Sequence, residues 1–71
     1  MEFDYKQFHI NAAPLAEGGR YYARAKVLRI AKSGPPVEVK WSGDLGRYPS
    51  EMEAFEAAKR WAIQWCDENP V

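Results

Sequence analysis

The sequence predicts an α+β fold in which a three-stranded antiparallel meander is followed by one C-terminal helix packed on one face of the sheet. Apolar and polar residues alternate in three segments of the first part of the chain, as they do in half-buried strands. Short turns with glycine or proline join these segments, which favours antiparallel neighbours. Residues 50–69 carry the 3.6-residue period of an amphipathic helix.

The first predicted strand covers residues 3–12, where apolar and polar side chains alternate. Phe8 and Ile10 lie on one side of such a strand, and Tyr5 and His9 lie on the other. A single histidine at an outward position, with no partner that the sequence can assign, is most often a plain surface residue. We therefore expect Phe8 and Ile10 in the core and His9 in solvent.

The second predicted strand covers residues 21–30 and follows a Glu-Gly-Gly turn at residues 17–19. Ala23 and Ala25 occupy one side of it and leave room for large side chains of the helix to lie flat on the sheet. The cations between and after them cannot face a core without partners. We therefore place both alanines, together with Val27, on the inner side.

The third predicted strand covers residues 37–41 and follows a loop rich in glycine and proline. The alternation places Val37, Val39 and Trp41 on the core side, because the two residues between them are charged. A second glycine-containing turn follows. The sequence does not decide whether residues 47–48 form one short further strand before the helix.

The helix is the best-defined element, because its start, its period and its end agree. Ser50 is a hydroxyl N-cap, and Glu53 stands at the position that completes a capping box. Pro49 and Pro70 bracket the segment. The predicted core face of the helix comprises Ala54, Phe55, Ala58, Trp61, Ala62 and Trp65.

Length and composition indicate one small domain over residues 1–71. A core of this size supplies only about 3–5 kcal/mol of net stability, so the ten aromatic residues must provide much of the buried area. One cysteine cannot form an internal disulfide, and the segment MEFDYKQF lacks the basic and apolar regions of a secretion signal. We therefore expect a cytoplasmic protein without a membrane span.

A formal net charge of zero hides a segregation of charge along the chain. Residues 20–47 carry seven Lys or Arg side chains against two acids, whereas residues 48–71 carry five acids against two bases. Such a basic segment can bind anions. Basic strands beside an acidic helix also form an ordinary solvated surface that balances its own charge, and composition favours this second interpretation.

The sequence contains no nucleophile elbow, P-loop, dinucleotide-binding glycine pattern or zinc-ligand spacing. Cys66 is predicted to fill apolar space in the last helical turn, where the acids that follow it raise the pKa of a thiol. Capping and the helix dipole explain the early glutamates of the helix. We therefore expect a protein that is not an enzyme and uses no catalytic residue, cofactor, metal or small-molecule substrate.

Several short motifs, in their order along the chain, resemble a group of small bacterial proteins of β-β-β-α form and unknown function. The matching segments are GRYYARA at residues 19–25, GRYPS at 46–50, EAFEAA at 53–58 and WAIQW at 61–65. The resemblance covers nearly the whole chain. Because its motifs lie mostly at core and cap positions, it implies a fold and no activity.

A weaker resemblance is to the AP2-type and integrase arm-type DNA-binding domains, which also place three strands before one helix. It rests on LGRYPS at residues 45–50 and Glu-Ala at 53–54, which are similar to the helix entry of the AP2 domain. Those families read DNA with Arg and Trp on the open face of the sheet. Here the resemblance implies Arg24 and Lys26 as the available cations, whereas Trp41 is expected on the core side.

A single helix covers only one face of a sheet, so the other face is predicted to be open. The side chains expected there mix aromatic and aliphatic groups with cations, which an idle surface does not need. This candidate partner-contact face comprises Tyr5, Tyr22, Arg24, Lys26, Leu28, Ile30 and Lys40. We interpret the protein as a non-catalytic interaction module that binds another protein or a second copy of itself through this face or a sheet edge.

The alternative interpretation is a nucleic-acid-binding domain that uses the basic face of the sheet. In that case Arg24, Lys26, Lys40 and Arg47 contact phosphates, and an outward-facing tyrosine stacks on bases or sugars.

Overall fold

The computed structural model describes residues 1–70 and, within them, contains seven strands in two antiparallel sheets and one C-terminal helix. The elements are β1 (Glu2–Tyr5), β2 (Phe8–Ala12), β3 (Leu15–Glu17), β4 (Arg20–Tyr22), β5 (Ala25–Arg29), β6 (Val37–Trp41), β7 (Arg47–Tyr48) and α1 (Glu51–Glu68). The sheet orders are β1-β2-β5-β6 and β3-β4-β7. The α+β class with a C-terminal helix is confirmed, and the three-stranded meander is wrong.

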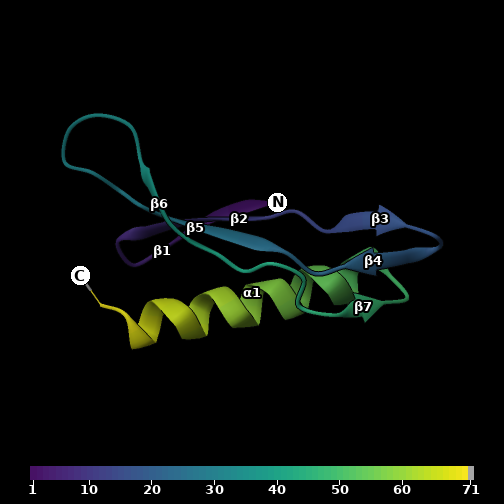
Figure 1. Cartoon of the computed structure of the whole chain (residues 1–71). Coiled ribbons are helices and arrows are strands. Elements are labelled where there is room, and N and C mark those ends of the chain that lie inside the picture. Colours follow the sequence, from purple (N-terminus) through teal and green to yellow (C-terminus); the bar gives the residue numbers. More distant parts are fainter. Residues whose placement is uncertain (71) are drawn as a thin grey trace.

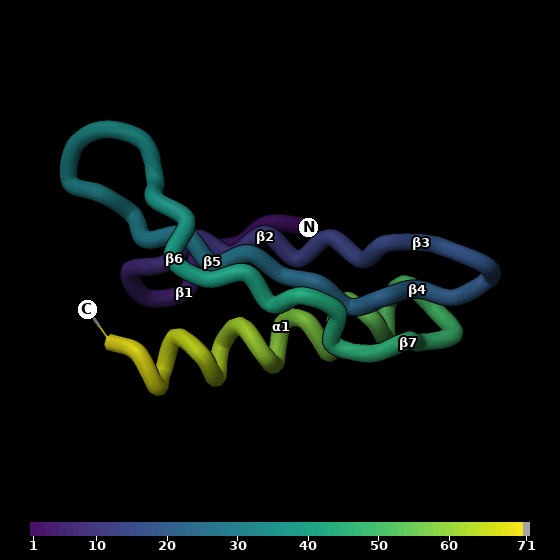
Figure 2. Tube along the Cα trace, in the orientation of Figure 1, coloured from purple at the N-terminus to yellow at the C-terminus, as the bar shows by residue number. Residues whose placement is uncertain are grey.

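Helix α1 runs along one side of both sheets (Figure 1). The four-stranded sheet lies over the C-terminal half of α1, and the three-stranded sheet lies beside its N-terminal half (Figure 1). The loop between β5 and β6 rises on the side away from the helix, as the chain trace in Figure 2 shows. One face of the four-stranded sheet is therefore covered by α1 and the other is open.

The first predicted strand is in fact a hairpin. β1 and β2 pair antiparallel with Tyr5 opposite Phe8, and Lys6 and Gln7 form the turn between them. Lys6 takes a positive φ of 55°, a conformation that tight hairpins need and that the sequence does not announce with glycine or asparagine. Because the chain reverses there, Tyr5 turns to the same side as Phe8 instead of the opposite one.

The second predicted strand is interrupted, but its predicted inner residues stay on the predicted side. β4 belongs to the three-stranded sheet and β5 to the four-stranded one, and Ala23 between them bonds to neither ladder. Its amide donates to the Gly46 carbonyl at 3.1 Å, and its carbonyl accepts from the Leu45 amide at 2.9 Å. Ala23, Ala25 and Val27 are fully buried, so the predicted inner side is confirmed.

The predicted glycine turn joins β3 to β4. Gly18 and Gly19 both have positive φ, at 58° and 76°, between the paired residues Glu17 and Arg20. Two central residues with positive φ match the right-handed twist of a hairpin. The short strand at residues 47–48, left open by the sequence, forms as β7 and pairs with β4.

The third predicted strand forms, but none of its three predicted core residues is buried. Val37, Val39 and Trp41 are 50%, 37% and 44% exposed. The register of β6 against β5 shifts between Val27 and Leu28, which leaves one extra residue in β6. Such a β-bulge breaks the alternation of sides within a strand, and it places Trp41 opposite Lys26, on the sheet face away from the helix.

Helix α1 begins and ends where the sequence predicts. Ser50 is the N-cap, and its Oγ accepts from the Glu53 amide at 3.2 Å. The same hydroxyl donates to Glu53 Oε2 at 3.1 Å, so the Glu53 carboxylate contacts the cap side chain rather than the cap amide. At the other end, the Asn69 side chain donates to the Trp65 carbonyl at 2.9 Å.

Replacing Ser50 with alanine should lower the free energy of unfolding by about 0.5–2 kcal/mol without changing the fold. The substitution leaves the Glu53 amide without its acceptor at the start of the helix. Urea denaturation followed by far-UV circular dichroism measures the loss. Ser50→Asp is the matched control, because a carboxylate can accept the same bond, and an alanine variant as stable as wild type would contradict the cap.

The core lies between α1 and the two sheets and is built largely from small residues. Its buried members are Phe8, Ile10, Ala12, Ala23, Ala25, Val27, Ala54, Phe55, Ala57, Ala58, Ala62 and Cys66. Trp61 and Trp65 are only half-buried and pack against this cluster. The Trp65 ring meets Phe8 edge-on, with ring centroids 5.7 Å apart.

Candidate interaction surface

The outer face is the side of the four-stranded sheet away from α1. Cross-strand register places Asp4, His9 and Leu28 in one row across it, and Lys26 and Trp41 in the next. The outer face comprises Glu2, Asp4, His9, Asn11, Lys26, Leu28, Glu38 and Trp41 by register, with Arg24 just before β5. Arg24, Lys26 and Leu28 were thus predicted correctly to lie together.

Tyr5 was predicted on this face but lies on the helix side of β1, half-buried against the core. Its hydroxyl donates to Asp67 Oδ1 at 2.8 Å, and Lys6 Nζ donates to the same oxygen at 2.7 Å. Hydrogen bonds from Lys6 and from Tyr5 lower the pKa of Asp67. Tyr5 and Lys6 therefore connect the β1–β2 turn to the end of α1 instead of facing a partner.

Two other predicted residues, Lys40 and Tyr22, also lie off the outer face, whereas Ile30 keeps its predicted exposure. Lys40 lies opposite Val27 and so points to the helix side of β6, because the bulge inverts its side. Tyr22 belongs to the three-stranded sheet. Ile30 follows the end of β5 and is 45% exposed.

The cations of the outer face already have acidic partners. Arg24 Nε donates to Asp44 Oδ1 at 2.5 Å, and Lys26 Nζ lies 3.9 Å from Glu38 Oε1. Lys26 also lies over the Trp41 ring, 5.8 Å from its centroid. Because each cation is neutralised locally, this part of the face presents no strong excess of positive charge to a polyanion.

Trp41 also borders a shallow hollow of about 220 Å³ at the end of the outer face. The hollow is lined by Asn11, Ala13, Pro14, Leu15, Arg24, Lys26 and Trp41. Its lining comes from the β2–β3 connection, the start of β5 and the end of β6. Sequence reasoning missed this arrangement, because the alternation in residues 37–41 assigns Trp41 to the core.

β6 is an edge strand that carries three exposed large apolar side chains. Every residue from Val37 to Trp41 is exposed, and β6 pairs with β5 alone in the four-stranded sheet. The backbone groups on its free side therefore have no ladder partner. Ile30, at the start of the adjoining loop, adds a further exposed aliphatic side chain.

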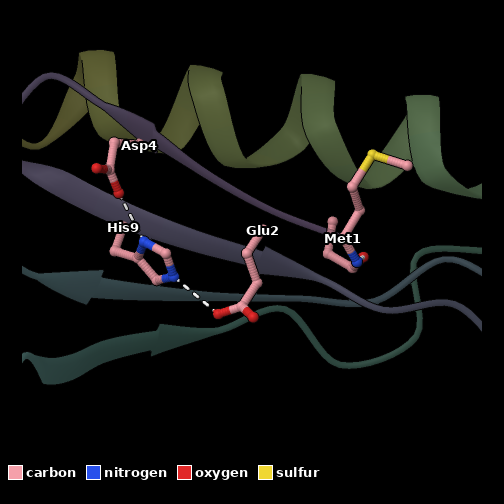
Figure 3. Close-up of polar contacts among 5 residues, drawn as sticks. Met1, Glu2, Asp4 and His9 are labelled. Atoms are coloured by element: carbon pink, nitrogen blue, oxygen red, sulfur yellow. Dashed lines mark hydrogen bonds and ion pairs between the residues drawn. The ribbon is translucent and has the colours of Figure 1, made fainter.

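His9 lies between two carboxylates on the outer face, as Figure 3 shows. Its Nδ1 is 2.6 Å from Asp4 Oδ1, and its Nε2 is 2.8 Å from Glu2 Oε1. The hydrogen bond to Glu2, and after it the one to Asp4, raise the pKa of His9 above its usual 6.5. The prediction of a surface position is confirmed, whereas the absence of partners is wrong, because only the hairpin brings Glu2 and Asp4 to the ring.

The two carboxylates approach opposite ring nitrogens, so they do not converge on one point where a cation could sit. Among residues 1–70, no group of three or more His, Cys, Asp or Glu side chains is arranged to hold a metal ion. Cys66 is buried, and burial followed by the nearby Asp67 raises the pKa of its thiol. This agrees with the predicted role of Cys66 as an apolar filler.

No family model, curated protein or solved structure matches this chain. The two resemblances found in the sequence therefore stay predictions, and function is argued from the geometry of the surface. The helix found in residues 1–70 is not both long and apolar enough to cross a membrane.

Proposed function

We propose that the protein is a non-catalytic interaction module that self-associates through the β6 edge and the adjoining outer face. The observation that carries this proposal is an edge strand in which every residue is exposed and three are large apolar residues, Val37, Val39 and Trp41. Natural proteins usually shorten, cover or charge such edges, because their free backbone groups pair readily with another strand. An apolar strand left open at an edge is typical of a strand-addition surface.

A second copy of the chain is the occupant that the charge distribution favours. The formal net charge is zero, so two copies approach without long-range repulsion. The local pairing of Arg24 and Lys26 with acids leaves the outer face without an excess of positive charge that would favour a nucleic acid. An edge strand is also complementary to its own copy, since two antiparallel strands exchange the same backbone donors and acceptors.

The two edges of the sheet favour a closed pair over a growing fibre. The opposite edge, β1, carries two acids, Glu2 and Asp4, which repel the same edge of a second copy, whereas β6 carries one acid and one base, Glu38 and Lys40. β6 itself has a bulge and Lys40, which limit how far an added sheet can extend. Pairing of β6 with β6 about a two-fold axis uses up the open edge of both copies.

Val39→Asp should weaken self-association by about 100-fold or more, because an unpaired carboxylate would be buried in an apolar contact. Sedimentation velocity over a concentration series measures the dimer dissociation constant. Met52→Asp is the matched control: it adds the same charge at an apolar residue that is 62% exposed on α1. This control should associate like wild type, and far-UV circular dichroism should show both variants folded.

Two results would overturn the proposal. One is a wild-type chain that sediments as a monomer at its highest soluble concentration. The other is equal weakening by Val39→Asp and Met52→Asp. The same runs with mixed-sequence duplex DNA test the alternative function: a complex that weakens steeply with salt, through release of counterions, would favour nucleic-acid binding instead.

A further inference from the structure

The side chains of Glu2, Asp4 and His9 connect an edge strand to its neighbour at two points. His9 lies on β2 directly opposite Asp4 on β1, and Glu2 lies two residues away from Asp4 on β1, opposite Asn11. The two ring nitrogens contact one carboxylate each, at 2.6 Å and 2.8 Å (Figure 3). β1 has only four residues and pairs with β2 alone in its sheet, so this contact spans most of its length.

We propose that these three side chains form a pH-sensitive latch, which holds β1 onto β2 while His9 is protonated and loosens β1 when the imidazole becomes neutral. The latch lies at the edge opposite β6. Its hydrogen bonds involve no residue of β6, so its test does not depend on the proposed self-association.

The chemistry of the ring makes the contact depend on protonation. An imidazolium carries two N–H donors, so both carboxylates accept a charge-assisted hydrogen bond. A neutral imidazole carries one N–H, and its other nitrogen then presents a lone pair to a carboxylate. Loss of one proton therefore removes one of the two bonds and the charge that offsets Glu2 and Asp4.

The other charged groups near His9 have partners of their own and do not contact the imidazole. On β5 the residue opposite His9 is Leu28, and the charged neighbours beyond it, Lys26 and Glu38, pair with each other. On the other side of the sheet, Lys59 of α1 lies over the Phe3 ring. Asp67 of α1 pairs with Lys6 and with the Tyr5 hydroxyl. The two carboxylates of β1 are the charges in contact with the ring.

Contacts at both ends of β1 confine the loosening to this one strand. The Met1 ammonium donates to the Ala12 carbonyl at 2.7 Å, and the Ala12 amide donates to the Met1 carbonyl at 2.8 Å. At the turn, Lys6 and Tyr5 bond to Asp67. The strand between these ends has Phe3 half-buried beneath it, so loosening β1 opens the edge of β2 without unfolding the rest.

The direction of the pH dependence follows from the raised pKa of His9. A group that binds its proton more tightly in the folded state stabilises that state fully below its unfolded pKa, which is 6.5 for histidine. The stabilisation is lost as the pH rises through the higher folded-state pKa. β1 is therefore held in mildly acidic solution and released in alkaline solution.

Amide hydrogen exchange measured residue by residue by NMR tests the latch. Between about pH 5.5 and about pH 8.5, the protection factors of the β1 amides should fall by about threefold to fivefold, the effect of one exposed charge-assisted contact. The amides of β5 should keep their protection. Expressing the result as protection factors removes the intrinsic pH dependence of exchange.

His9→Gln is the control variant, because glutamine cannot carry the charge. Its β1 amides should show the same low protection at both pH values. In Asp4→Asn, a direct NMR titration of the imidazole protons should show a lower pKa for His9 than in wild type. Equal protection of β1 at both pH values in wild type, no protection of β1 at about pH 5.5, or an unchanged His9 pKa in Asp4→Asn would each overturn the proposal.

Discussion

Phe8→Ala should leave the chain largely unfolded. Phe8 is 2% exposed, and its ring packs edge-on against Trp65. Removing a buried phenylalanine side chain costs about 3–5 kcal/mol, through lost burial and the cavity left behind. The net stability of so small a core is itself only about 3–5 kcal/mol, so one substitution consumes nearly all of it.

Urea denaturation and near-UV circular dichroism measure this effect. Phe8→Leu, which keeps most of the apolar volume, should retain a cooperative transition at a lower midpoint. Met52→Ala removes an exposed apolar side chain from α1 and should stay within about 0.5 kcal/mol of wild type. A Phe8→Ala variant with a wild-type midpoint would show that the contact between β2 and α1 does not hold the fold.

Ala25→Leu should destabilise the protein by about 1–3 kcal/mol, because the helix lies too close to the sheet at this point to accept a larger side chain. Ala25, Ala58 and Ala62 are all fully buried in the one core cluster. The Ala25 backbone cannot move away easily. Its amide donates to Ser42 Oγ at 2.8 Å, and its carbonyl accepts from the Ser42 amide at 2.9 Å.

Thermal denaturation compares Ala25→Leu with Ala13→Leu, a matched change at an exposed alanine. The Ala13 variant should melt near the wild-type temperature, whereas the Ala25 variant should melt several degrees lower. If both melted together, the core would have space beside β5, and the small residues of the sheet would not set its distance from the helix.

The helix could be predicted from the sequence because its signals are local. The N-cap hydroxyl of Ser50, the period of apolar residues and the bracketing prolines all lie within the segment that they define. The inner sides of β2 and β5 were predictable for a similar reason. Alternation within each segment is regular, and the charged residues between Ala23, Ala25 and Val27 have only one acceptable side.

The β1–β2 hairpin could not be predicted, because its turn depends on a lysine with positive φ. Lys6 carries no local preference for that conformation. The turn forms because pairing with β2 and the bonds from Tyr5 and Lys6 to Asp67 hold it in place. The partners of His9 could not be predicted for the same reason, since Glu2 and Asp4 reach the ring only across the hairpin.

By itself, the sequence determined the fold class, the helix with its cap, and the inner faces of the two central strands, because those features arise from short-range periodicity and capping. Tertiary structure alone decided the division into two sheets, the reversal of β1 and the bulge in β6. Each of these depends on which strand lies beside which, and a single extra residue in β6 moves Trp41 to the outer face. The candidate surface therefore comes from register, which hydrogen bonds between distant segments set and which alternation within one segment does not encode.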